Sequence, residues 1–126
     1  MQLVFKVDGR LPGLNEIINE ARRNRYSSAS MKKKYQKPLE LLFKKQACGQ
    51  RIKRHATVKG YFYEPYNRKY RRDDDNVTVG MKFIMDAFTQ AGIIPDDNPN
   101  YVHTISERIK DCEKPRIEIV ITEDVE

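Results

Sequence analysis

Apolar residues that alternate with polar ones predict four β-strands in this chain. In the clearest case Ile117, Ile119 and Ile121 fall on one face of an extended segment, because side chains on a strand alternate between its two faces. β-Branched and aromatic residues, which favour strands, are concentrated in another of these segments. The expected strands are residues 3–7, 57–63, 101–109 and 116–122.

An apolar period of three to four residues predicts a helix over residues 76–91. Successive apolar positions are separated by four, three, four and three residues, which places them in one stripe on a helical surface. Gly92 follows directly and is a suitable C-terminal stop. The residues of the stripe are Val77, Met81, Ile84, Phe88 and Ala91.

A second helix is expected from Met31 to about Gln50. The hydroxyl side chains of residues 27–30 are a helix-start signal, Pro38 limits where the helix is regular, and Gly49 is a suitable stop. The order is then strand, helix, strand, helix, strand, strand. This order predicts an α/β fold, a mixed β-sheet packed by helices.

Length and composition predict one small domain over residues 1–126. The chain has a mass of 14.8 kDa and 39% hydrophobic residues, which is enough for a core, and it contains no linker or internal repeat. It has no run of 18 apolar residues, and a charge at Lys6 interrupts the short apolar start, so neither a membrane span nor a signal peptide is expected. Two cysteines fit a reducing compartment. We therefore expect a cytoplasmic protein.

The charges divide the chain into a basic and an acidic part. Residues 1–72 carry 19 Lys and Arg against 5 Asp and Glu, whereas residues 73–126 carry 5 against 13. A basic part favours a polyanionic partner, most often nucleic acid, although a merely solvated surface would also explain it. The candidate nucleic-acid contacts are Lys32, Lys33, Lys34, Arg68, Lys69, Arg71 and Arg72.

Three consecutive aspartates follow these arginines. Asp73 and Asp75 are two residues apart, so on an extended chain they point the same way, and a loop after the next helix can add Asp97. Mg²⁺ prefers carboxylate oxygens together with water and phosphate. The pattern predicts a magnesium site at which a phosphodiester could be hydrolysed. The alternative is that the aspartates only cap the helix and offset its dipole.

Lys82 is a candidate for the same site. It comes seven residues after Asp75, close to two helical turns, and helical side chains lean toward the N-terminus. Its ammonium group would then point toward the aspartates. The alternative is a surface ion pair with Asp86, four residues further on.

Residues 71–98 resemble the RusA family of Holliday junction resolvases. The resemblance is carried by Arg-Arg-Asp-Asp-Asp-Asn at 71–76, then by Lys82, Asp86-Ala-Phe, Ala91-Gly92 and Asp96-Asp97. The segment Leu-Pro-Gly-Leu-Asn that ends at Asn15 is similar to the proline–asparagine opening of the family. The order of elements agrees over most of the chain, but only residues 71–98 match specifically.

The resemblance implies a RusA-like, homodimeric endonuclease that binds four-way DNA junctions and nicks two strands symmetrically in recombination and repair. It implies Mg²⁺ as the cofactor, with Mn²⁺ as an alternative, Asp73, Asp75 and Asp97 as metal ligands and Lys82 as the catalytic lysine. It also adds Asn15 to the DNA contacts and suggests a bacterial or phage origin. In the family the lysine follows the second aspartate by one turn, and here three extra residues intervene, which is about 4.5 Å along a helix.

The residues alone also permit a different class of protein. In that class the chain is a non-catalytic nucleic-acid-binding protein, and its carboxylates only cap a helix.

Overall fold

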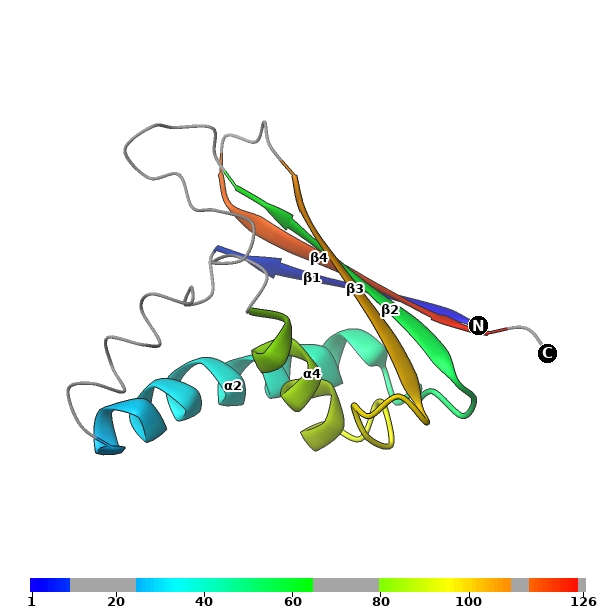
Figure 1. The fold of residues 1–126 in the computed structure, drawn as a ribbon, viewed down its shortest axis with the longest axis horizontal. Helices are drawn as coiled ribbons and strands as arrows, with labels where there is room; N and C mark the ends of the chain where they lie inside the picture. Colours follow the sequence, from blue (N-terminus) through cyan, green and yellow to red (C-terminus); the bar gives the residue numbers. More distant parts are fainter. Residues whose placement is uncertain (10–24, 65–79, 110–113, 125–126) are drawn as a thin grey trace.

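The computed structural model describes residues 1–9, 25–64, 80–109 and 114–124, with the side chains of residues 25–29, 31 and 32 left out. Two helices lie on one face of a four-stranded sheet (Figure 1). The elements are β1 (Gln2–Asp8), α2 (Arg25–Ala47), β2 (Ala56–Tyr63), α4 (Gly80–Gln90), β3 (Val102–Ile109) and β4 (Arg116–Glu123).

The sheet has the strand order β1-β4-β2-β3 and is mixed. β4 pairs antiparallel with both β1 and β2, whereas β2 and β3 run parallel. In the register, Ile119 of β4 lies opposite Phe5 of β1 on one side and Gly60 of β2 on the other. The predicted α/β class, mixed sheet and element order are confirmed.

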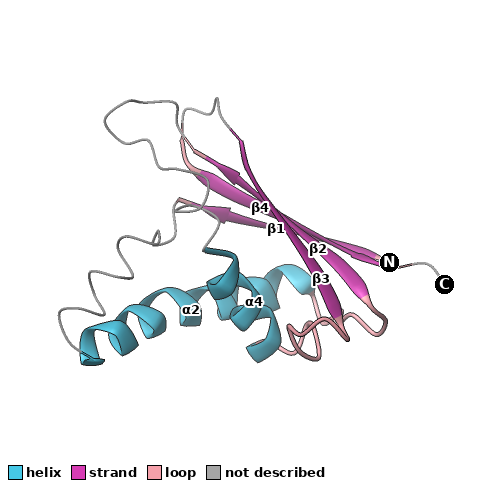
Figure 2. Ribbon diagram, viewed as in Figure 1, coloured by secondary structure: helices cyan, strands magenta, loops and turns pink. Residues whose placement is uncertain are grey.

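The core lies between the sheet and the helices (Figure 2). Phe5 of β1, Phe43 of α2 and Phe88 of α4 are at most 1% exposed. The ring centroids of Phe43 and Phe88 are 4.3 Å apart in a stacked arrangement, and Phe5 meets both edge-on at 5.3 and 4.9 Å. One aromatic residue from each element therefore joins the three elements, which fixes where α4 and its following loop lie on the sheet.

The predicted strands are confirmed, each within one residue at either end. The helix expected over 76–91 is confirmed for Gly80–Gln90, and residues 76–79 lie outside the described part. Gly92 has a φ of 76°, the left-handed conformation expected of a helix stop.

The predicted start of the second helix was wrong, whereas its predicted glycine stop is confirmed. α2 begins at Arg25 rather than Met31, because serine inside a helix costs only a few tenths of a kcal/mol and does not force a start. It continues through Pro38 and ends at Ala47, within a turn of the expected end at about Gln50. Cys48 and Gly49 both have positive φ, 52° and 82°, so the chain leaves the helix at the predicted Gly49 stop. No helix in the described part of the chain is long and apolar enough to cross a membrane.

Candidate functional site

The loop after α4 is held against the core by two buried isoleucines. Ile93 and Ile94 are each 2% exposed, and the Ile93 N–H donates to the carbonyl of Phe88 at 3.0 Å. The Ile93 carbonyl accepts the N–H of Ile52 at 2.8 Å, which ties the loop to the segment before β2. This anchoring decides where the aspartates that follow, at 96 and 97, are presented.

Asp96 organises the turn. Its carboxylate accepts the backbone N–H of Asp97 at 2.7 Å and the side-chain amide of Asn98 at 3.0 Å. These hydrogen bonds, first of all that from the Asp97 N–H, lower the pKa of Asp96. Asp96 therefore stays charged and has a structural function in the loop, the local capping pattern in which aspartate side chains bond nearby N–H groups.

Asp97 is exposed and lies in an acidic environment. Partial desolvation raises the pKa of Asp97, and contact with the Asp96 carboxyl and the negative charge of Asp86 raise it further. Asp86 belongs to α4, so the loop folds back to bring Asp97 within electrostatic reach of that helix. Its described acidic neighbours are Asp86 and Asp96. That Asp97 joins Asp73 and Asp75 stays a prediction, because those two residues lie outside the described part of the chain.

Lys82 lies in the first turn of the described part of α4 and is exposed. Asp86 lies one turn later and is half-buried, so the two residues share a side of the helix. The predicted ligands Asp73 and Asp75 lie outside the described residues. Within the described ranges, no group of three His, Cys, Asp or Glu side chains could hold a metal ion. The predicted magnesium site stays a prediction.

Five lysines of α2 with described side chains are exposed. Lys33, Lys37 and Lys44 are exposed and separated by four and seven residues, which places them on one stripe of the helix. Glu40 lies between them, with its carboxylate 3.7 Å from the Lys37 ammonium and 3.5 Å from that of Lys44. We name Lys33, Lys34, Lys37, Lys44 and Lys45 the α2 basic row.

The α2 basic row overlaps only in part with the predicted DNA contacts. Lys33 and Lys34 belong to both, and Lys34 also lies over the ring of Tyr35 at 5.5 Å. The other three members were not among the predicted contacts, although their helical spacing was an available signal. The side chain of Lys32 is outside the described part of the structure, and so are Asn15, Arg68, Lys69, Arg71 and Arg72.

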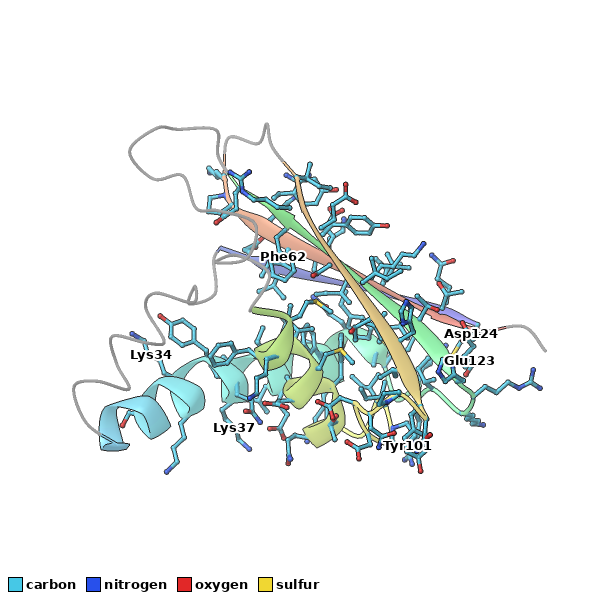
Figure 3. All side chains as sticks on the ribbon, viewed as in Figure 1. Lys34, Lys37, Phe62, Tyr101, Glu123 and Asp124 are labelled. Carbon is cyan, nitrogen blue, oxygen red and sulfur yellow. The ribbon has the colours of Figure 1, made fainter. Side chains whose placement is uncertain are left out.

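A second polar cluster, not foreseen from the sequence, lies at the end of the sheet where β4 finishes (Figure 3). His55 Nδ1 donates to the carboxylate of Asp124, whose other oxygen accepts the Thr57 hydroxyl at 3.0 Å. His55 Nε2 is 3.2 Å from the carbonyl of Pro99. The cluster joins the start of β2, the end of β4 and the loop that carries Asp97.

No protein-family model matches this chain, and no curated protein matches it.

Proposed function

We propose that the protein is a Mg²⁺-dependent, structure-selective endonuclease of the cytoplasm. It cleaves four-way DNA junctions by paired nicks as a homodimer, as its resemblance to the RusA resolvases implies. The observation that carries this proposal is the acidic loop beside α4. Asp97 lies near Asp86 on the helix that also bears Lys82, in the order in which the resemblance places a metal ligand and a catalytic lysine.

The donor set fits a hard divalent cation. Carboxylate oxygens are the ligands that Mg²⁺ prefers, and the pKa of Asp97 is raised by partial desolvation and by the neighbouring Asp96 and Asp86 carboxyl groups. Asp97 would hold the ion together with Asp73 and Asp75. When bound, Mg²⁺ supplies Lewis-acid chemistry, which activates water and neutralises charge on the phosphodiester.

The residues of the chain supply binding and charge. The exposed ammonium group of Lys82 can stabilise negative charge that develops on the scissile phosphate. The α2 basic row presents five cations that can hold the phosphates of a DNA arm. Asp96 keeps the loop turned so that Asp97 remains exposed.

Cleavage of a synthetic four-way junction tests the proposal. The wild-type protein should nick the junction with Mg²⁺ and only bind it without metal. Asp75→Asn and Asp97→Asn should each reduce the nicking rate by roughly 100-fold or more, because a lost ligand removes several kcal/mol of transition-state stabilisation. Both variants should bind the junction at least as tightly as wild type, since a negative charge beside the phosphates is gone. Asp73→Asn should behave in the same way.

Asp74→Asn is the matched control, with a milder effect expected on nicking. Binding is measured by gel shift in EDTA and nicking in Mg²⁺, on the same folded preparations. If folded Asp75→Asn and Asp97→Asn proteins nick the junction at near-normal rates, the metal-site assignment is wrong. A wild-type protein that binds junctions but never nicks them would favour the alternative, a non-catalytic nucleic-acid-binding protein.

A further inference from the structure

The strand β3 forms one edge of the described sheet, where it pairs only with β2. On its outer side the Val102 N–H, at the start of the strand, donates to the Asn98 carbonyl at 3.1 Å, and no other backbone group of the described residues bonds to Thr104 or Ser106 on that side. The opposite edge is different. At β1, Gln46 donates its amide to the Lys6 carbonyl at 2.9 Å and accepts the Lys6 N–H at 3.1 Å, which covers the middle of that strand. An open edge strand is a template for pairing with another strand.

The direction of the backbone groups of β3 follows from its register. The Ala56 N–H donates to Tyr101 O, and the Glu64 N–H donates to Ile109 O, so odd-numbered residues of this segment turn their polar groups toward β2. In a ladder these directions alternate, so Thr104 and Ser106 turn their N–H and C=O groups outward. Both residues are exposed.

The even-numbered and odd-numbered side chains of β3 lie on opposite faces of the sheet. Thr104 pairs with buried Val58, so the even-numbered side chains lie on the helix-covered face of the sheet. The odd-numbered ones lie on the other face and read Tyr101, His103, Ile105, Glu107 and Ile109. Tyr101 is 43% exposed and Ile105 is 42% exposed, which is high for large apolar residues.

We propose that β3 pairs antiparallel with β3 of a second copy of this chain, around a two-fold axis at Ile105. The row on the odd-numbered face is then complementary to itself. Ile105 meets Ile105 on the axis, and His103 of each copy lies opposite Glu107 of the other. Just outside the strand, Tyr101 meets Ile109. Apolar residues therefore face apolar ones, and an imidazole faces a carboxylate.

The hydrogen-bond pattern agrees with the same axis. Thr104 faces Ser106 of the second copy, and both have outward-directed N–H and C=O groups, as a hydrogen-bonded antiparallel pair requires. Ile105 on the axis is a non-hydrogen-bonded pair, in which side chains approach most closely. An axis at Ser106 would place Ile105 opposite Glu107, and an axis at Thr104 would place His103 opposite Ile105. In neither of these registers does the apolar side chain of Ile105 lie opposite another apolar side chain.

This pairing gives an interface to the homodimer of the proposed function. What the dimer contributes to DNA cleavage rests on that function. The axis is perpendicular to the sheet, so the helices and acidic loops of both copies lie on the same side of one continuous sheet. Asp97 precedes β3 by five residues. The two Asp97 side chains would therefore lie toward opposite ends of the shared strand pair, as two paired nicks require.

The test is the molar mass of the full chain in solution, measured by light scattering without DNA or metal. The wild-type protein should show twice the 14.8 kDa of one chain at micromolar concentration. Ser106→Pro should be monomeric, because it removes an outward N–H that β2 does not use. Ser106→Ala keeps that N–H and should stay dimeric. Circular dichroism checks that both variants are folded.

Charge changes at His103 supply a second test. His103→Glu places a carboxylate opposite Glu107 in both halves of the dimer and should weaken dimerisation by roughly tenfold, whereas His103→Lys should strengthen it. A wild-type monomer, or a folded Ser106→Pro protein that stays fully dimeric, would overturn the proposal. If Ser106→Pro does not fold, the His103 variants decide. The proposal is then overturned if His103→Glu and His103→Lys have equal dimer affinities, or if His103→Glu dimerises more tightly than His103→Lys. Loss of nicking in a protein that keeps this dimer counts against the proposed function alone.

Discussion

His55, just before β2, is hydrogen-bonded to Asp124, just after β4 and 69 residues later in the chain. The bond to Asp124 is the main cause that raises the pKa of His55, and the contact of Nε2 with the Pro99 carbonyl raises it further. The same bond lowers the pKa of Asp124, with the Thr57 hydroxyl as the next cause. Both ring nitrogens of His55 can donate only when the imidazole is protonated.

The pair predicts a pH dependence of stability. Because the pKa of His55 is raised in the folded protein, its contribution to folding stability is complete below the ordinary histidine pKa of 6.5. This contribution is lost as the pH rises through the pKa of His55 in the folded protein. The lowered pKa of Asp124 means that its contribution is present above the ordinary value of 3.8 and is lost as the pH falls through the folded value. The pair therefore stabilises the fold most at pH values above the protonation of Asp124 and below the deprotonation of His55.

Thermal unfolding between pH 5.5 and 8.5 measures the histidine part of this effect. The unfolding temperature of wild type should fall over this range by more than that of His55→Gln, because the variant lacks the titrating group. Equal slopes for wild type and His55→Gln would contradict the prediction.

Gly60 is required in β2 by its contact with α4. A Cβ atom at this position would overlap the Met81 sulfur and would lie 3.3 Å from the Phe62 ring. Because Met81 is buried but flexible, Gly60→Ala should cost about 1 kcal/mol and the branched Gly60→Val about 3 kcal/mol of unfolding free energy, measured by urea denaturation.

The neighbouring Lys59 is exposed, so Lys59→Ala should change the unfolding free energy by no more than about 0.5 kcal/mol. The Gly60→Ala/Met81→Ala double variant should destabilise less than the sum of its single changes, since the clash is gone. Additive effects would show that Met81 does not impose the glycine.

The two loop aspartates should affect stability in opposite ways. Asp97 has a raised pKa because its charge is disfavoured, so Asp97→Asn should keep or slightly raise the unfolding temperature at pH 7 without metal. Asp96 has a lowered pKa because its carboxylate accepts hydrogen bonds that favour the charged form, so Asp96→Asn should lower the unfolding temperature by a few degrees. Calorimetry of both isosteric variants compares them directly. The reverse order would show that Asp97, rather than Asp96, holds the loop.

Junction binding should depend on salt through the α2 basic row. Lys33→Ala/Lys34→Ala removes two exposed cations and should reduce the slope of log K against log salt by about 1.8, at about 0.9 per phosphate contact. The Lys6→Ala/Lys59→Ala variant removes the same charge from the opposite face of the sheet and should change the slope little. Gel shifts between 50 and 200 mM salt are sufficient.

The companion variant Arg71→Ala/Arg72→Ala should also flatten the slope. If it does so while the α2 variant behaves like wild type, the DNA surface lies on residues 68–72 and not on α2.

Local patterns were sufficient for the strands and for the apolar face of α4. The alternation at Ile117, Ile119 and Ile121 predicted three residues that are at most 2% exposed. It succeeded because a sheet covered on one face imposes a period of two on its strands. The start of α2 was not predicted, because serine is only a weak start signal when the flanking residues still favour a helix.

The candidate site could be predicted only in part. Aspartates and lysine at this spacing are a property of the chain, and they alone suggested metal-dependent nuclease chemistry. The structure decided that Asp96 is a hydrogen-bonded loop residue whereas Asp97 is the exposed carboxylate near Asp86. Two adjacent aspartates cannot be distinguished from the sequence, because their different roles depend on which N–H groups the folded loop directs at each.

The sequence by itself determined the periodicities, the element order, the glycine stop after α4 and the separation of charge between the two parts of the chain, since each depends on residues close together along the backbone. Only the tertiary structure decided the strand order β1-β4-β2-β3, the pairing of His55 with Asp124, and the place of β3 at an edge of the described sheet. These depend on segments far apart in sequence, whose contacts form only when burial of the shared core brings them together.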